Sequence, residues 1–186
     1  PILRAVAAHH GPVALLHFDA HPDTFDDDGK RFDHGSMFLR ARNEGLIDVS
    51  RSCQVGIRTY NDSDYGFEIL SSPWVHKHGI EATIAAVRER VGDARVYLTF
   101  DIDCLDPAFA PGTGTPVAGG LSSAQALGIL RALHGLDLVG ADVVEVAPAY
   151  DISEITAIAA ATIAHDILCL LAVRKGAVGK PVGRSD

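Results

Sequence analysis

Residues 13–23 read VALLHFDAHPD, and this stretch determines the fold class of the chain. Its first six residues are nearly all apolar, as expected for a strand buried on both faces of a parallel sheet. Asp19, His21 and Asp23 follow at every second position. In extended chain such residues project to the same side, so three potential metal ligands leave one end of a buried strand.

A second apolar stretch, residues 96–100, leads into acidic residues in the same way, because Asp101 and Asp103 follow it. Four carboxylates gathered without counter-charge would repel one another, whereas two divalent cations would balance their charge. Carboxylates with a minority of imidazole suit Mn²⁺ better than they suit structural zinc. A single aspartate at a strand end is most often a turn former or a helix cap. Five ligands at period two favour a two-metal site instead, which would make a bridging water acidic enough to act as a nucleophile.

The rest of the chain alternates between strand and helix signals, which predicts a parallel sheet covered by helices. Further strands are expected at residues 138–146 and, less clearly, at 53–57. Three helices are expected: one along the stripe Ile80, Ile84, Val87 and Val91 up to Gly92, one from the capping box Ser122/Gln125 to about Leu133, and one from Ser153 to about residue 176. Residues 22–34 and 104–120 resist regular assignment and follow strands, where open parallel sheets bind ligands.

Length and composition restrict the class of protein. At ~150 residues per domain, 186 residues favour one unit, and 47% hydrophobic residues exclude a disordered chain. A net charge of −8 disfavours a nucleic-acid partner. The apolar stretch 155–173 is interrupted by polar residues, so no membrane span is expected. Cys53, Cys104 and Cys169 form no CxxC pair and predict reduced structural thiols in a cytoplasmic protein.

Three motifs resemble the signatures of the arginase/agmatinase (ureohydrolase) family. Residues 16–23 resemble its DAHxD signature, residues 100–107 with 111–116 its second, and residues 142–148 its third. Within the family, three further segments are similar to the bacterial agmatinase branch: residues 32–38, 44–48 and 55–58. The resemblance covers residues 1 to about 175 and implies a three-layer α/β/α fold with a mainly parallel sheet, arginase/deacetylase-like. Residues 176–186 are expected to form a loose tail.

The resemblance also implies roles for the metal ligands. Asp19 and Asp101 would bridge two Mn²⁺ ions, Asp23 would bind one of them, and the other would take His21 and Asp103. Asp23 would in addition accept a hydrogen bond from a bridging hydroxide. His17 projects to the same side as Asp19, and we expect it behind the ligands rather than among them.

Two further residues receive roles from the resemblance. His34 would be a mobile histidine that shuttles protons, with helix capping at Ser36 as the alternative. Glu145 ends an apolar strand, where a lone carboxylate needs a partner, and the resemblance assigns that partner as the guanidinium of the substrate. An internal ion pair between Glu145 and Arg58 is the alternative.

The reaction implied is hydrolysis of the guanidino group of agmatine to putrescine and urea. The acidic character of residues 24–33 favours a dication over a substrate with a carboxylate; the acids are Asp26, Asp27, Asp28 and Asp33, against Lys30 and Arg31. Guanidinobutyrate or arginine as substrate remains an alternative, as does a truncated metal-binding subunit without catalysis. The resemblance also implies a homo-oligomer, a trimer or hexamer.

One family feature is absent from the sequence. Relatives carry a further metal-binding histidine in a GGDH-type motif just before the position where this chain starts, at Pro1. We therefore expect the chain to be the C-terminal portion of a single domain, and the 186-residue polypeptide alone to be weakly active or inactive.

Overall fold

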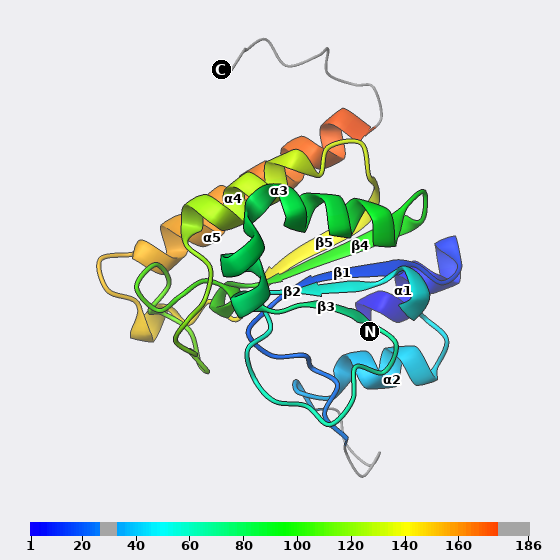
Figure 1. Cartoon of the computed structure of the whole chain (residues 1–186), viewed down its shortest axis with the longest axis horizontal. Coiled ribbons are helices and arrows are strands. Elements are labelled where there is room, and N and C mark those ends of the chain that lie inside the picture. The colour runs from blue at the N-terminus through cyan, green and yellow to red at the C-terminus, as the bar shows by residue number, and fades with distance from the viewer. Residues whose placement is uncertain (27–32, 175–186) are drawn as a thin grey trace.

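The computed structural model describes residues 1–26 and 33–174, which form one parallel sheet between two layers of helices (Figure 1). The sheet has five strands in the order β3-β2-β1-β4-β5, and every pairing is parallel. The strands are β1 (Ala14–Phe18), β2 (Cys53–Val55), β3 (Glu68–Leu70), β4 (Arg95–Asp101) and β5 (Asp137–Val144). The predicted α/β class with a parallel sheet is confirmed.

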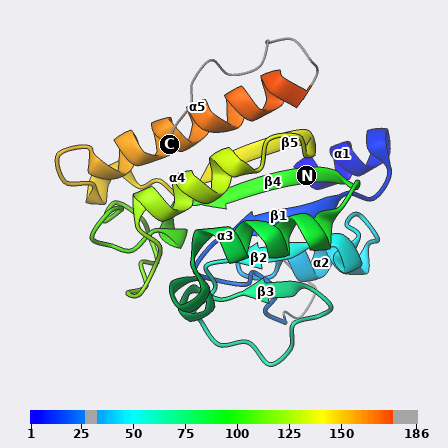
Figure 2. The same ribbon diagram turned by 45° about the horizontal axis from the view of Figure 1, so that its top comes forward.

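Helices cover both faces of the sheet, as Figures 1 and 2 show. Three helices lie on one face: α3 (Ser72–Val91), α4 (Ser123–Ala132) and α5 (Ile155–Arg174). Two lie on the other: α1 (Ile2–His10) and α2 (Met37–Asn43). The chain thus has the three-layer α/β/α arrangement that the sequence predicts.

The central strand β1 is buried along its whole length, because it has sheet neighbours on both edges and helices on both faces. Its even-numbered side chains belong to the larger core under α3, α4 and α5, where Phe18 stacks on Phe100 with ring centroids 5.1 Å apart. Leu15 joins a smaller core on the opposite face together with Phe38 and Tyr97. Burial on both faces explains the run of apolar residues that opens the chain's first motif.

The register between β1 and β4 positions the site. Phe18 pairs with Phe100, so Asp19 and Asp101 leave neighbouring strands at the same level of the sheet. The two acidic stretches, about eighty residues apart in sequence, therefore meet at the carboxyl ends of the strands, where open parallel sheets bind ligands.

Several boundaries differ from the sequence-based expectations. Strand β3 and helices α1 and α2 were not predicted, because each is too short to show a clear period. Helix α3 begins at Ser72, and its first turns are separated from the predicted stripe by a break at Gly79, which has φ 84°. Strand β5 ends at Val144, so Glu145 follows the strand instead of ending it.

The start of α5 differs from the prediction because Ser153 has φ 56° and cannot act as its N-cap. Asp151 takes that role. Its carboxylate accepts hydrogen bonds from the backbone N–H groups of Thr156 and Ala157, at 3.0 and 2.9 Å. Serine and aspartate are about equally good caps, and the sequence favoured Ser153 because it lies nearer the start of the helix, whereas here the Asp151 carboxylate reaches across a tight turn.

Helix α5 is long and apolar enough to cross a membrane by length and composition alone. It packs on β5 and α4, and it buries Ile163, Ile167 and Leu170 against the core. Its outer face is exposed and includes Cys169, so the prediction of a structural thiol is wrong for this cysteine. Cys53 and Cys104 are buried free thiols, as predicted.

Candidate metal centre

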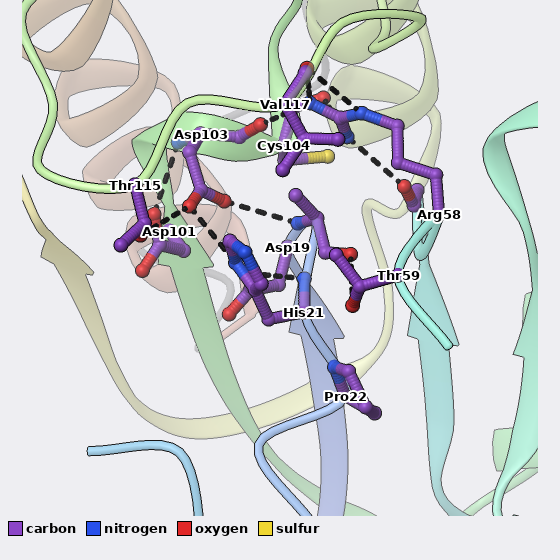
Figure 3. Close-up of polar contacts among 12 residues, drawn as sticks. Asp19, His21, Pro22, Arg58, Thr59, Asp101, Asp103, Cys104, Thr115 and Val117 are labelled. Carbon is purple, nitrogen blue, oxygen red and sulfur yellow. Dashed lines mark hydrogen bonds and ion pairs between the residues drawn. The ribbon is translucent and has the colours of Figure 1, made fainter. Parts of the chain in front are cut away.

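Asp19, His21 and Asp103 meet at the carboxyl ends of β1 and β4 (Figure 3). The imidazole Nδ1 of His21 lies 3.1 Å from Asp103 Oδ2 and 3.3 Å from Asp19 Oδ1. The backbone ties the group together, because the N–H of Ala20 donates to Asp103 Oδ1 at 3.0 Å. Their ligand atoms lie within 4.8 Å of one another, close enough to surround one cation.

Asp23 and Asp101 complete the set of five predicted ligands. A ligand atom of Asp23 lies within 4.8 Å of ligand atoms of Asp19 and His17, in a second group of possible metal ligands. Asp101 is buried, and its Oδ1 accepts a hydrogen bond from the backbone N–H of Asp103 at 2.9 Å. In Figure 3 Asp103, which lies in the 3-10 helix Ile102–Cys104 after β4, contacts His21, and Asp101 lies beside Asp103. Among the described residues, the structure places Asp19, His21, Asp23 and Asp103, with His17, in two groups that share Asp19, whereas Asp101 belongs to neither group and is joined to them through its hydrogen bond with Asp103.

The electrostatics of the cluster favour cations. Burial, with the charges of Asp19 and Asp103, raises the pKa of Asp101 to about 10. Burial and the Asp19 charge raise the pKa of Asp23 to about 7. Hydrogen bonds to Asp103 and Asp19 raise the pKa of His21 to about 10. Protons therefore partly neutralise the cluster, and divalent cations would replace them.

The donor set fits a pair of hard or borderline divalent ions. It consists of four carboxylates and one imidazole, with no thiolate among them. Carboxylate oxygens with some imidazole nitrogen are typical of Mn²⁺ and related ions. His21 is the one ligand that is partly exposed, with 21% of its side-chain surface accessible, so the cluster opens to solvent on its side.

The loop at residues 104–120 joins this cluster to Glu145. The hydroxyl of Thr115 lies 3.4 Å from Asp103 Oδ2, and the N–H of Ala147 donates to the Gly112 carbonyl at 2.8 Å. A Cβ on Gly114 would lie 3.8 Å from Glu145 Oε2. Glu145 therefore borders the same short loop that contacts the metal ligands.

Glu145 is exposed and lies in the left-handed region, with φ 65°. Its exposure corrects the argument that a buried carboxylate there must be paired. The alternative partner, Arg58, is occupied elsewhere, as described below. Asp23 also has a positive φ, 51°. Such backbone conformations in residues other than glycine cost energy and cluster at functional sites.

Arg58 clamps the loop from inside. Its guanidinium donates to the backbone carbonyls of Asp103 and Val117, at 2.6 and 2.7 Å, and to those of Gly56 and Cys104, at 3.1 and 3.3 Å (Figure 3). This network connects the end of β2 with both ends of the loop. Arg58 therefore holds the loop in position.

Arg58→Lys should lower the free energy of unfolding by about 2–4 kcal/mol, because a single ammonium cannot reach all these carbonyls and leaves several unsatisfied. Urea denaturation would measure the loss. Arg131→Lys is the matched control, since the Arg131 side chain is 60% exposed and pairs with Asp166 at the surface. Equal effects of the two substitutions would contradict this role of Arg58.

His34 lies in the exposed turn before α2. Across residues 1–26 and 33–174, no hydrogen bond joins it to the five ligands. Two backbone hydrogen bonds nevertheless anchor its turn beside the cluster. The N–H of Phe25 donates to the Gly35 carbonyl at 2.9 Å, and the N–H of Phe38 donates to the backbone carbonyl of Asp23 at 3.0 Å. Ser36 makes no side-chain cap, and residues 27–32 of the acidic stretch 24–33 lie outside the described residues.

Sequence reasoning missed two residues at the centre. Thr115 contacts Asp103, but a threonine in a loop rich in Gly and Pro has no distinguishing signal. Gln54 is 1% exposed and contacts His17 through its amide nitrogen. A lone amide within an apolar strand is the signal that could have found it.

Fold and site together define a class: an α/β domain with a carboxylate-rich candidate metal centre at the carboxyl end of its parallel sheet. Comparison with known proteins refines this class. The family model described as "Arginase family" matches residues 1–170. The chain belongs to the arginase family.

Individual relatives agree with the family assignment. The chain is 61% identical to the agmatinase of Chromobacterium violaceum over 94% of its own length and 55% of that protein. It superimposes with a TM-score of 0.93 on the crystal structure of a hypothetical agmatinase from Burkholderia thailandensis, at 61% identity, covering 95% of this chain and 56% of that one. It superimposes on proclavaminate amidino hydrolase from Streptomyces clavuligerus with a TM-score of 0.87 at 42% identity, covering 92% of this chain and 60% of that one. The chain thus spans a little over half the length of these relatives.

Proposed function

We propose that this chain carries the metal-binding part of an agmatinase, which hydrolyses agmatine to putrescine and urea. The observation that carries the proposal is the convergence of Asp19, His21, Asp23 and Asp103 after two neighbouring strands, with Asp101 hydrogen-bonded to Asp103. Glu145 borders the loop whose Thr115 contacts Asp103. The agmatinases of Chromobacterium violaceum and Cronobacter sakazakii, at 61% and 59% identity, support the substrate.

The bound group in this proposal is a pair of Mn²⁺ ions, held by Asp19, His21, Asp23, Asp101 and Asp103. When bound, the ions would balance the charge of the four carboxylates and make water acidic enough to act as a nucleophile near neutral pH. Asp23 would accept a hydrogen bond from that nucleophile and hold its orientation.

The substrate would be bound by charge complementarity. The exposed carboxylate of Glu145 offers two oxygens to the planar guanidinium, which can donate two parallel hydrogen bonds to it. The acidic composition of residues 24–33 and a net charge of −8 favour a dication such as agmatine over an amino acid with a carboxylate. His34, in its anchored turn, would donate the proton that the departing amine requires.

Urea release in the presence of Mn²⁺ tests the proposal. We expect the full-length protein to release urea from agmatine faster than from arginine or guanidinobutyrate, and Glu145→Gln to lower kcat/KM by about 100-fold or more because a neutral amide binds guanidinium weakly. Glu154→Gln, an exposed glutamate at the start of α5, is the matched control. A higher kcat/KM for arginine or guanidinobutyrate would contradict agmatine as the substrate.

We further propose that the protein is cytoplasmic and forms a homo-oligomer. Apolar side chains on the outer face of α5, including Ile158 and Leu168, are more than half exposed and would gain from burial against another subunit. Light scattering of the purified protein would measure the number of subunits, and a monomer at micromolar concentration would contradict the proposal.

A further inference from the structure

Behind the metal ligands lies a buried polar pair that the proposed reaction does not use. His17 in β1 and Gln54 in β2 are each 1% exposed. They are paired in the parallel register of the two strands, so their side chains lie next to each other on the same face. His17 also precedes Asp19 by two residues and projects to the same side.

A backbone carbonyl determines which way the amide of Gln54 points. Its nitrogen lies 2.7 Å from the carbonyl oxygen of Pro22, which can only accept a hydrogen bond. The same nitrogen lies 3.1 Å from His17 Nδ1. The opposite orientation would place the amide oxygen against the Pro22 oxygen, and the two acceptors would repel each other. The structure instead leaves Gln54 Oε1 as a buried oxygen without a hydrogen-bond partner.

The orientation of the amide determines where His17 carries its proton. An NH₂ group donates to Nδ1, so Nδ1 must be an acceptor and the ring carries its proton on Nε2. This geometry excludes a second proton on Nδ1, although burial is outweighed by the Asp19 charge and hydrogen bond, which raise the pKa of His17. His17 Nε2 lies 2.7 Å from Asp19 Oδ2 and therefore donates to it. The Phe38 ring packs edge-on against the imidazole, with centroids 4.5 Å apart, and holds it in place.

We infer that Gln54 is a positioning residue, which keeps the His17 proton on Nε2 so that His17 orients the Asp19 carboxylate and does not bind metal itself. Proximity alone would allow the opposite, because His17, Asp19 and Asp23 form one of the two groups of possible metal ligands. As a ligand, Nε2 would lose its proton, and its lone pair would then face an Asp19 oxygen at 2.7 Å.

This arrangement leaves Asp19 with each oxygen held. Oδ2 accepts from His17, and Oδ1 accepts from the backbone N–H of His21 at 2.6 Å. A carboxylate fixed at both oxygens cannot rotate away from a bridging position, and hydrogen-bonded partners behind a ligand typically contribute 10–100-fold in metal affinity. The inference rests on the proposed function only in taking Asp19 as a metal ligand.

Nitrogen-15 NMR of the histidine rings in the full chain tests the inference directly. His17 would be assigned through its contact with the Phe38 ring. In the metal-free protein we expect the Nε2–H tautomer, and on loading with diamagnetic Zn²⁺ or Cd²⁺ we expect His17 to keep that proton while His21 shows the shift of a metal-bound nitrogen. An Nδ1–H tautomer, or a metal-bound shift at His17, would overturn the inference.

Gln54→Glu provides the second test, because it replaces the donor facing Nδ1 with an acceptor. His17, with a carboxylate at each ring nitrogen, should then take a second proton on Nδ1 and become an imidazolium, and Mn²⁺ affinity should fall about 10–100-fold. Gln125→Glu is the matched control, because the second glutamine of the chain lies in the capping box of α4, where glutamate serves equally well. Unchanged Mn²⁺ affinity in Gln54→Glu would overturn the role of Gln54.

Two features keep the test separate from the proposed activity. The tautomer is read in the metal-free chain, so the result supports or overturns the inference whether or not the protein releases urea. Gln54→Leu, which neither donates nor accepts, is the second variant if Gln54→Glu does not fold. Asp19 should still keep the proton on Nε2, but the ring loses its anchor at Nδ1, so Mn²⁺ affinity should fall. Unchanged Mn²⁺ affinity in Gln54→Leu would show that Gln54 does not position His17.

Discussion

Asp101→Asn should lower Mn²⁺ affinity by about 100-fold or more, or at least about 2.8 kcal/mol, while leaving the stability of the metal-free protein nearly unchanged. The carboxyl of Asp101 has its pKa raised to about 10 by burial and by the charges of Asp19 and Asp103, so it is neutral near pH 7 when no metal is bound. Asparagine is a close match for that neutral form. Its amide oxygen can still accept the hydrogen bond from Asp103 N–H.

Manganese titration followed by electron paramagnetic resonance would measure the affinity, and urea denaturation with a chelator present would measure metal-free stability. The change in the free energy of unfolding should stay within about 1 kcal/mol. Asp93→Asn is the matched control, because Asp93 is exposed at the opposite end of the sheet, before β4, and should affect neither quantity. Undiminished Mn²⁺ affinity in Asp101→Asn would rule out its role as a bridging ligand.

Metal binding should release protons, so Mn²⁺ affinity should rise steeply with pH. Near pH 7, Asp101 and His21 hold protons because their pKa values are raised to about 10, and Asp23 is near half-protonation because its pKa is raised to about 7. A proton that must leave for a metal to bind makes the affinity about tenfold tighter per pH unit. We expect release of about two protons and thus about a 100-fold change per unit near pH 7.

The stability of the metal-free protein and that of the Mn²⁺-bound protein should change in opposite directions as pH rises. Asp101, Asp23 and His21 have higher pKa values in the folded than in the unfolded chain, so the metal-free protein should lose stability as pH rises from about 4 to about 10. With Mn²⁺ in excess the trend should reverse, because the metal competes better as protons leave.

Calorimetric titration of Mn²⁺ in two buffers with different ionisation enthalpies would count the protons released. Denaturation series from pH 5 to 9, with and without Mn²⁺, would give the two slopes. Magnesium at the same ionic strength is a control for general screening of the acidic surface. A proton count near zero, or the same slope in both series, would contradict this picture of the cluster.

The ligands in residues 19–23 and 101–103 could be predicted from the sequence because they end or directly follow a buried strand. The expectation that they alternate along extended chain is wrong, because β1 ends at Phe18, Asp23 has φ 51° and Asp103 lies in the 3-10 helix Ile102–Cys104. That the two strands are neighbours could not be read from either stretch, since strand order depends on long-range pairing; β1 lies between β2 and β4 in the sheet.

Glu145 and Gln54 show where such reasoning reaches its limit. Glu145 was identified from its place at the end of a strand, yet its exposure and positive φ arise from the turn that follows β5. Gln54 was not identified from the sequence because its role depends on two contacts made by folding. It pairs with His17 of the neighbouring strand, and it donates to the backbone carbonyl of Pro22. Contacts made by backbone atoms leave no trace in residue types.

Anomalous diffraction at the manganese edge, from crystals grown with Mn²⁺, would test the central claim most directly. We expect one peak bounded by His21 and Asp103 and a second bounded by Asp23, with Asp19 and Asp101 in contact with both. Both should lie at the carboxyl ends of β1 and β4. Density maps without a peak in contact with Asp19 and Asp103, or with manganese bound only elsewhere, would contradict the assignment of this cluster as a metal centre.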